Sequence, residues 1–87
     1  MKLMIVIVHD TDSEIVLQTL IGQGFRVTRV ASTGGFLRRG NATFLIGVES
    51  EKVDKVFELL KHTTRSVEQE QHRATVFVVD MPYYEQI

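Results

Sequence analysis

Four short runs typical of β-strands alternate with two stretches of helical character, and their order is the feature that most constrains the fold. The runs cover residues 3–8, 25–32, 42–48 and 74–79. The first, third and fourth are almost wholly apolar, whereas the second alternates apolar and polar side chains. One helical stretch follows the first run, and the other separates the third run from the fourth. The chain therefore has the order strand, helix, strand, strand, helix, strand.

Capping signals and apolar periodicity locate the two helices. Thr11 and Glu14 have the spacing of a capping box, which predicts that Thr11 caps the first helix. Gly22 and Gly24 are placed to end it, because glycine adopts positive φ readily. The second helix is predicted over residues 51–62, where apolar side chains recur at i, i+3, i+4 and i+7. These side chains are Val53, Val56, Phe57 and Leu60.

This order predicts an α+β fold, the βαββαβ arrangement of a ferredoxin-like sandwich with both helices on one face of an antiparallel sheet. The 87 residues leave room for one domain, so we expect a single domain over residues 1–87. Three of the four runs are apolar on both faces, although a monomer would leave one sheet face in water. Because the chain has no third layer to cover that face, we expect copies of the chain to associate.

Composition narrows the classes of function. Ten Lys and Arg residues stand against eleven Asp and Glu residues, which argues against nucleic-acid binding. The lack of cysteine excludes thiolate chemistry and fits a reducing cytosol, so we expect a cytoplasmic protein. The apolar start is too short for a membrane span, which predicts no membrane insertion. No serine has the context of a nucleophile elbow, and His9, Asp10 and Asp12 are more typical of a solvated turn than of a metal site. We therefore expect no enzymatic activity, no metal and no cofactor.

The connection at residues 33–41 has the residue types of an anion-binding loop. Gly34 and Gly35 permit a close approach of the backbone to a ligand. Phe36 and Leu37 offer an apolar surface on which a base can stack. Four arginines surround this connection: Arg26, Arg29, Arg38 and Arg39. Together these residues suit a ligand with phosphate and purine character, although glycines that serve a hairpin and arginines on a solvated face explain the pattern equally well.

The stretch GFRVTRVASTGGFLRRGNATFLIGV, residues 24–48, resembles the signature of the PII-like cyclic di-AMP receptor family. The opening MKLMIVIVHDTDS, the run ATVFV and the final Glu85-Gln86 are similar as well, so the resemblance covers nearly the whole chain. The connection at residues 63–73 is shorter here than in typical members. Family members are ferredoxin-like subunits that form trimers and bind ligand in the clefts between adjacent subunits. The resemblance therefore implies a PII-like homotrimer.

The resemblance also implies a set of ligand-binding residues. They are Arg26, Thr28, Gly35, Phe36, Leu37, Asn41, Gly47, Phe77 and Gln86. The first two match positions at the phosphodiester region, and the next three match backbone and apolar contacts to the nucleotide. The following two match positions at the buried adenine, and the last two match contacts from the final strand and tail.

The expected function is that of a cyclic di-AMP-binding signal transduction protein. Ligand would bind at the subunit interfaces of a homotrimer, and a downstream protein would recognise the bound state. Two alternatives stay open from the sequence. One is a PII-like receptor for another adenine nucleotide, ATP or ADP, and the other is a non-catalytic trimeric scaffold.

Overall fold

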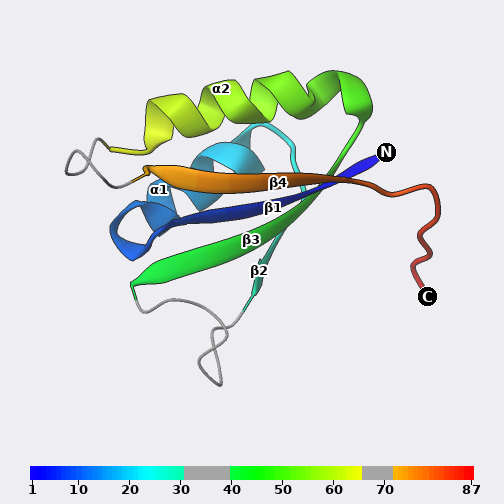
Figure 1. Cartoon of the computed structure of the whole chain (residues 1–87), viewed down its shortest axis with the longest axis horizontal. Helices are drawn as coiled ribbons and strands as arrows, with labels where there is room; N and C mark the ends of the chain where they lie inside the picture. The colour runs from blue at the N-terminus through cyan, green and yellow to red at the C-terminus, as the bar shows by residue number, and fades with distance from the viewer. Residues whose placement is uncertain (31–39, 66–71) are drawn as a thin grey trace.

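Strands and helices follow one another in the predicted order. The computed structural model describes residues 1–30, 40–65 and 72–87. The elements are β1 (Lys2–His9), α1 (Asp10–Gly22), β2 (Val27–Val30), β3 (Asn41–Val48), the 3₁₀ helix η1 (Ser50–Lys52), α2 (Val53–Thr63) and β4 (Ala74–Asp80) (Figure 1).

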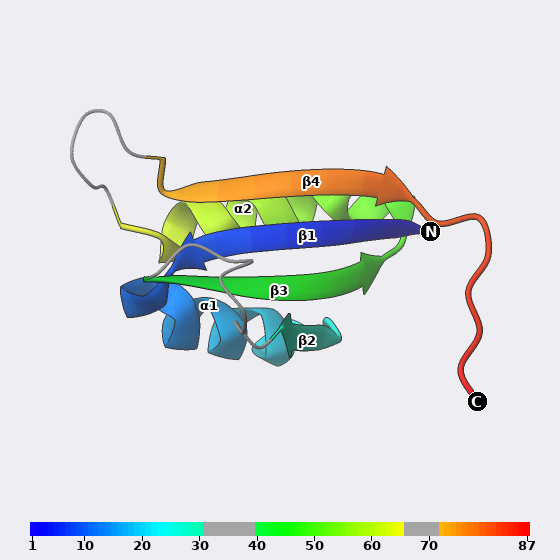
Figure 2. The same ribbon diagram turned by 60° about the horizontal axis from the view of Figure 1, so that its bottom comes forward.

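The four strands form one antiparallel sheet in the order β2-β3-β1-β4. Strand β1 is central and pairs with both β3 and β4, while β2 pairs with β3 at one edge. Both helices lie on the same side of the sheet (Figure 2). The α+β prediction is confirmed, and this arrangement is compatible with a ferredoxin-like fold.

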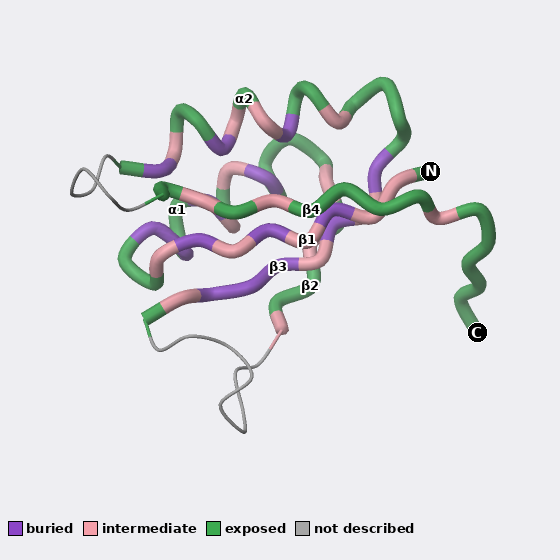
Figure 3. Tube along the Cα trace, in the orientation of Figure 1, coloured by how far each residue is buried: buried purple, intermediate pink, exposed green. Residues whose placement is uncertain are grey.

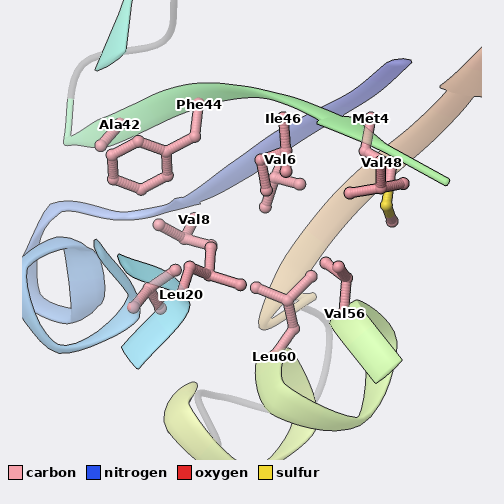
Figure 4. Close-up of a cluster of buried hydrophobic side chains, with 11 residues drawn as sticks. Met4, Val6, Val8, Leu20, Ala42, Phe44, Ile46, Val48, Val56 and Leu60 are labelled. Carbon is pink, nitrogen blue, oxygen red and sulfur yellow. The ribbon is translucent and has the colours of Figure 1, made fainter. Parts of the chain in front are cut away.

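The core lies between the sheet and the helices. Side chains alternate along each strand, so the even-numbered residues of β1 and β3 face the helices. Helix α2 contributes Val56 and Leu60, two of the four apolar residues whose spacing predicted the helix (Figure 4). The buried apolar residues are Met4, Val6, Val8, Val16, Leu20, Ala42, Phe44, Ile46, Val48, Val56 and Leu60.

The predicted cap of the first helix is wrong. Helix α1 begins at Asp10, directly after β1, so Thr11 lies inside its first turn. A residue in helical conformation cannot act as N-cap, because that position requires extended backbone. His9 occupies the N-cap with φ −68° and ψ 144°, and the described residues provide no side-chain cap there.

Other boundaries differ from the prediction by a few residues. Strand β2 starts at Val27 rather than at residue 25, and the predicted residues 31 and 32 lie outside the described part of the chain. Gly22 is the last residue of α1, and Gly24 carries the positive φ of 89° that the turn requires. The predicted second helix divides into η1 and α2.

The sheet face away from the helices is rich in apolar side chains. It carries the odd-numbered residues of β1 and their register partners on β4, among them Leu3 opposite Val79 and Ile5 opposite Phe77. Phe77 is 53% exposed, and β4 and most of the tail after it lie at the surface (Figure 3). We refer to this surface as the open face. In the part of the chain that the structure describes, no helix is long and apolar enough to cross a membrane.

An ion pair joins β1 to β4 at one end of their pairing. Lys2 Nζ contacts Asp80 Oδ1, and this hydrogen bond, with the lysine charge, lowers the pKa of Asp80. Because the folded-state pKa is the lower one, the stabilisation is present at neutral pH and is lost as the pH falls through the pKa of the folded state. Asp80 is exposed, so we expect a small effect on stability.

Replacing Lys2 with Met should return the pKa of Asp80 to the ordinary aspartate range. A titration of the side-chain carboxyl by carbon NMR measures this pKa directly. A low pKa that persists in Lys2→Met would show that the lysine does not cause the shift.

Candidate ligand site

A hollow of about 450 Å³ lies on the open face, where the end of β3 meets the start of β2 and the tail after β4. We call it the ligand hollow. The strand register brings its walls together, since Thr28 pairs with Leu45 and Leu3 pairs with Gly47. Its lining residues are Met1, Leu3, Arg26, Thr28, Leu45, Gly47, Met81, Tyr84 and Gln86.

Two arginines that are close in the sequence, Arg26 and Arg29, point to opposite faces of the sheet because of the alternation along β2. Val27 pairs with the buried Ile46, so the neighbouring residues Arg26 and Thr28 turn to the open face. Arg29 turns to the helix side, where its Nη1 lies 3.9 Å from Glu14 Oε1. Of the arginines that the structure describes, Arg26 is therefore the one that lines the ligand hollow.

Gly47 keeps the floor of the ligand hollow open. A Cβ at this position would lie 3.7 Å from Cε of Met81 and 4.0 Å from Cε of Met1. These are ordinary contact distances, so a methyl group fits, whereas a larger side chain would occupy the hollow itself.

The tail is fixed to the first residue of the chain. The Met81 amide donates a hydrogen bond to the Met1 carbonyl over 3.1 Å. From this point the tail brings Tyr84 and Gln86 to the ligand hollow. Tyr83 does not line it, and its hydroxyl lies 3.3 Å from Glu85 Oε2.

A second hollow of about 280 Å³ adjoins the first and shares Met1, Arg26 and Gly47 with it. It adds the charged side chains of Lys52 and Glu49. Arg26 thus stands between the two hollows, where its guanidinium can reach an anionic group that spans them.

The site offers the chemistry of binding. It combines a guanidinium, a hydroxyl, an amide and an aromatic ring with apolar walls. Within residues 1–30, 40–65 and 72–87, no three His, Asp or Glu side chains are grouped as metal ligands.

A comparison with protein families decides the assignment. The model of the cyclic-di-AMP receptor family matches residues 1–74 of this chain. The chain belongs to the cyclic-di-AMP receptor family. The resemblance noted in the sequence is thereby confirmed, and membership supports cyclic di-AMP binding.

A crystal structure of a functionally unknown protein from Pediococcus pentosaceus ATCC 25745 is similar to this receptor-family chain. The two share 36% sequence identity with a TM-score of 0.79, over 99% of this chain and 96% of the other.

The structure gathers part of the site that the family resemblance implies. Four of the expected ligand residues of this receptor-family chain line the ligand hollow: Arg26, Thr28, Gly47 and Gln86. Asn41 and Phe77 do not line it. Three more expected residues lie outside the described part of the chain: Gly35, Phe36 and Leu37.

Asn41 lies at the far end of β3 from the ligand hollow. It pairs with His9, whereas Gly47 pairs with Leu3. The six residue steps from Asn41 to Gly47 correspond to roughly 20 Å of strand at about 3.3 Å per residue. One chain therefore does not bring these two expected ligand residues to the same hollow.

Sequence reasoning missed five residues that line the ligand hollow: Met1, Leu3, Leu45, Met81 and Tyr84. Two of them could have been found, since Leu3 and Leu45 are odd-numbered residues on strands whose even-numbered residues fill the core. Nothing in the sequence distinguishes Tyr84 from Tyr83, because their positions depend on how the tail is anchored.

Proposed function

We propose that the protein is a cytoplasmic, PII-like signal receptor that binds cyclic di-AMP at the subunit interfaces of a homotrimer and catalyses no reaction. A downstream protein would recognise the bound state. The observation that carries this proposal is the ligand hollow, in which Arg26, Thr28, Gly47 and Gln86 meet from separate parts of the chain.

The residues of the ligand hollow suit the two chemical parts of cyclic di-AMP. The Arg26 guanidinium and the Thr28 hydroxyl can donate hydrogen bonds to a phosphodiester oxygen. The Tyr84 ring offers a face for an adenine, and the Gln86 amide can donate to and accept from the edge of the base. Gly47 leaves the space that a purine needs.

The distance between Asn41 and Gly47 supports a site that two copies of the chain complete. Both residues are odd-numbered positions of β3 and belong to the open face, yet they lie roughly 20 Å apart by strand length. A second copy packed against the open face could bring its own Asn41 or Phe77 to the ligand. The apolar side chains of that face supply a surface for such packing.

Isothermal titration of cyclic di-AMP into the purified protein tests the proposal, with the oligomeric mass measured on the same sample. We expect one cyclic di-AMP per subunit of a trimer, with no heat from ATP, ADP or cyclic di-GMP. Binding of ATP or ADP in place of cyclic di-AMP would assign a different adenine nucleotide. A trimer that binds none of the four would favour a scaffold, and a monomer that binds cyclic di-AMP would overturn the interface site.

Replacing Tyr84 with Ala should weaken cyclic di-AMP binding by about 1 kcal/mol, or roughly fivefold. Stacking of a base on an aromatic ring contributes about 1–3 kcal/mol, and we take the lower end because Tyr84 is 56% exposed in the single chain. Tyr83→Ala is the matched control, since Tyr83 belongs to the same tail but does not line the hollow. Calorimetry that finds equal losses for both variants would refute stacking on Tyr84.

A further inference from the structure

The junction between β1 and α1 is joined to the start of β3. The Asp10 amide donates a hydrogen bond to the Gly40 carbonyl over 2.7 Å. His9, the last residue of β1, is the register partner of Asn41. Gly40 has φ of 87°, a conformation that favours glycine and sets the direction in which the chain enters β3. The junction therefore fixes both the first residue of β3 and the residue before it.

The same junction is joined to the residue that leaves α2. The Asp12 carboxylate is 2% exposed, and its Oδ2 accepts a hydrogen bond from the Arg65 amide over 3.3 Å. A buried carboxylate is costly unless it is hydrogen-bonded, so this contact favours one position of Arg65. The preceding residue, Thr64, is also buried, and its hydroxyl donates a hydrogen bond to the Leu60 carbonyl over 2.7 Å.

A third contact reaches the residue that leads into β4. His9 Nε2 lies 3.0 Å from the His72 carbonyl, where the ring nitrogen can donate a hydrogen bond. Arg65 and His72 lie near the two ends of the connection from α2 to β4, and we call them its flanks. The two flanks are thus bonded to side chains of the same junction: Arg65 to Asp12, and His72 to His9.

We propose that the β1–α1 junction couples the start of β3 to both flanks of the α2–β4 connection. Asn41 is an expected ligand residue, so binding there would reach His72 through His9 and would reach Arg65 through Asp12. This transmission from bound ligand to the two flanks rests on the proposed function. The coupling between the bonded segments is a property of the fold itself, since each contact constrains the same short stretch of backbone.

A surface hollow beside the α2–β4 connection is the part of the molecule that this coupling would change. A hollow of about 340 Å³ lies between α2 and β4, and Thr64, His72 and Arg73 form part of its lining. Displacement of His72 therefore changes the shape of this hollow, and displacement of Arg65 would act on it through the neighbouring Thr64. It is built from residues other than those of the ligand hollow, so one surface can respond to the other without sharing a side chain.

A matched pair of glycine variants tests the coupling without ligand. Gly40 and Gly24 both have positive φ, and no described atom lies within 4 Å of a Cβ at either, so alanine imposes similar backbone strain on each. We expect Gly40→Ala to speed hydrogen exchange of the Arg65 amide at least fivefold, as measured by NMR, and Gly24→Ala to change it less than twofold. The Val6 amide lies in β1, which is paired on both sides, so it reports global unfolding and should change equally in the two variants because the imposed strain is similar.

Hydrogen exchange of the Arg65 amide in the presence of cyclic di-AMP tests the transmission from bound ligand. In the wild-type protein, saturating cyclic di-AMP should change Arg65 exchange at least fivefold. This response should fall below twofold in Asp12→Ala, because Asp12 is the residue that bonds Arg65, and Asp12→Asn should restore it because the amide oxygen still accepts from the Arg65 amide.

The outcomes separate this proposal from the proposed function. With equal Val6 responses in the two variants, an Arg65 response to Gly40→Ala no larger than the response to Gly24→Ala would overturn the coupling. Calorimetric binding of cyclic di-AMP with unchanged Arg65 exchange would overturn transmission from the ligand. Absence of calorimetric binding, with the Gly40→Ala effect present, would refute the proposed function and leave the coupling supported.

Discussion

Replacing Arg26 with Ala should reduce the affinity for cyclic di-AMP by about 10- to 100-fold. A hydrogen bond to a charged group contributes about 1.5–3 kcal/mol, and each 1.4 kcal/mol is tenfold in affinity. Arg26 lines both adjoining hollows, so its loss removes the guanidinium that we assign to the phosphodiester. Calorimetry with the variant and the wild-type protein at one salt concentration measures the difference.

Arg29→Ala is the control for that experiment. Arg29 is close to Arg26 in the sequence and carries the same charge, but it turns to the helix side, where its guanidinium carbon lies 5.9 Å from the Phe44 ring centroid. We expect its loss to change cyclic di-AMP affinity less than twofold. Equal losses from both variants would indicate that total charge, rather than a contact in the hollow, controls binding. Unchanged affinity in Arg26→Ala would refute its assigned role.

Replacing Phe77 with Asp should convert the proposed trimer to monomers. Phe77 is 53% exposed on the open face, opposite Ile5 and two residues from Val79. Transfer of an ionised carboxylate into an apolar contact costs several kcal/mol when nothing pairs with it. Sedimentation velocity across a range of concentrations measures the mass, and circular dichroism checks that the subunit is still folded.

Ile15→Asp provides a control of matched exposure and charge. Ile15 is 54% exposed on α1, which lies on the helix side of the sheet. The same change of residue type there should leave the mass of the assembly unchanged. A folded Phe77→Asp variant that keeps the trimer mass would show that the open face is not the contact surface between copies.

Periodicity predicts the helices and strands of this chain well where burial is one-sided. Helix α2 has apolar residues on a single face, and Val56 and Leu60 of that face are buried as expected. The start of α1 could not be predicted in the same way. Thr11 has a suitable spacing to Glu14, but the helix continues straight from β1 and leaves no extended residue at Thr11.

The candidate site divides into parts that depend on local and on long-range structure. Alternation along β2 is local, so the residue pattern alone puts Arg26 and Thr28 on one face. The expected role of Gly47 comes from the family resemblance alone, and the strand register places Gly47 in the same hollow as Thr28. The position of Tyr84 depends on the hydrogen bond between Met81 and Met1. This bond joins residues far apart in the sequence, so the local sequence does not predict it.

The bond between Met81 and Met1 has a practical consequence for the design of protein reagents. Met1 and Gln86 both line the ligand hollow, and the two termini lie on the same side of the molecule (Figure 1). An affinity tag fused to either terminus would extend from the edge of that hollow and would compete for space with the ligand that we propose to bind there. Tag-free protein is therefore the appropriate sample for binding studies, and a fluorophore is better attached at Gln18, which is exposed on α1.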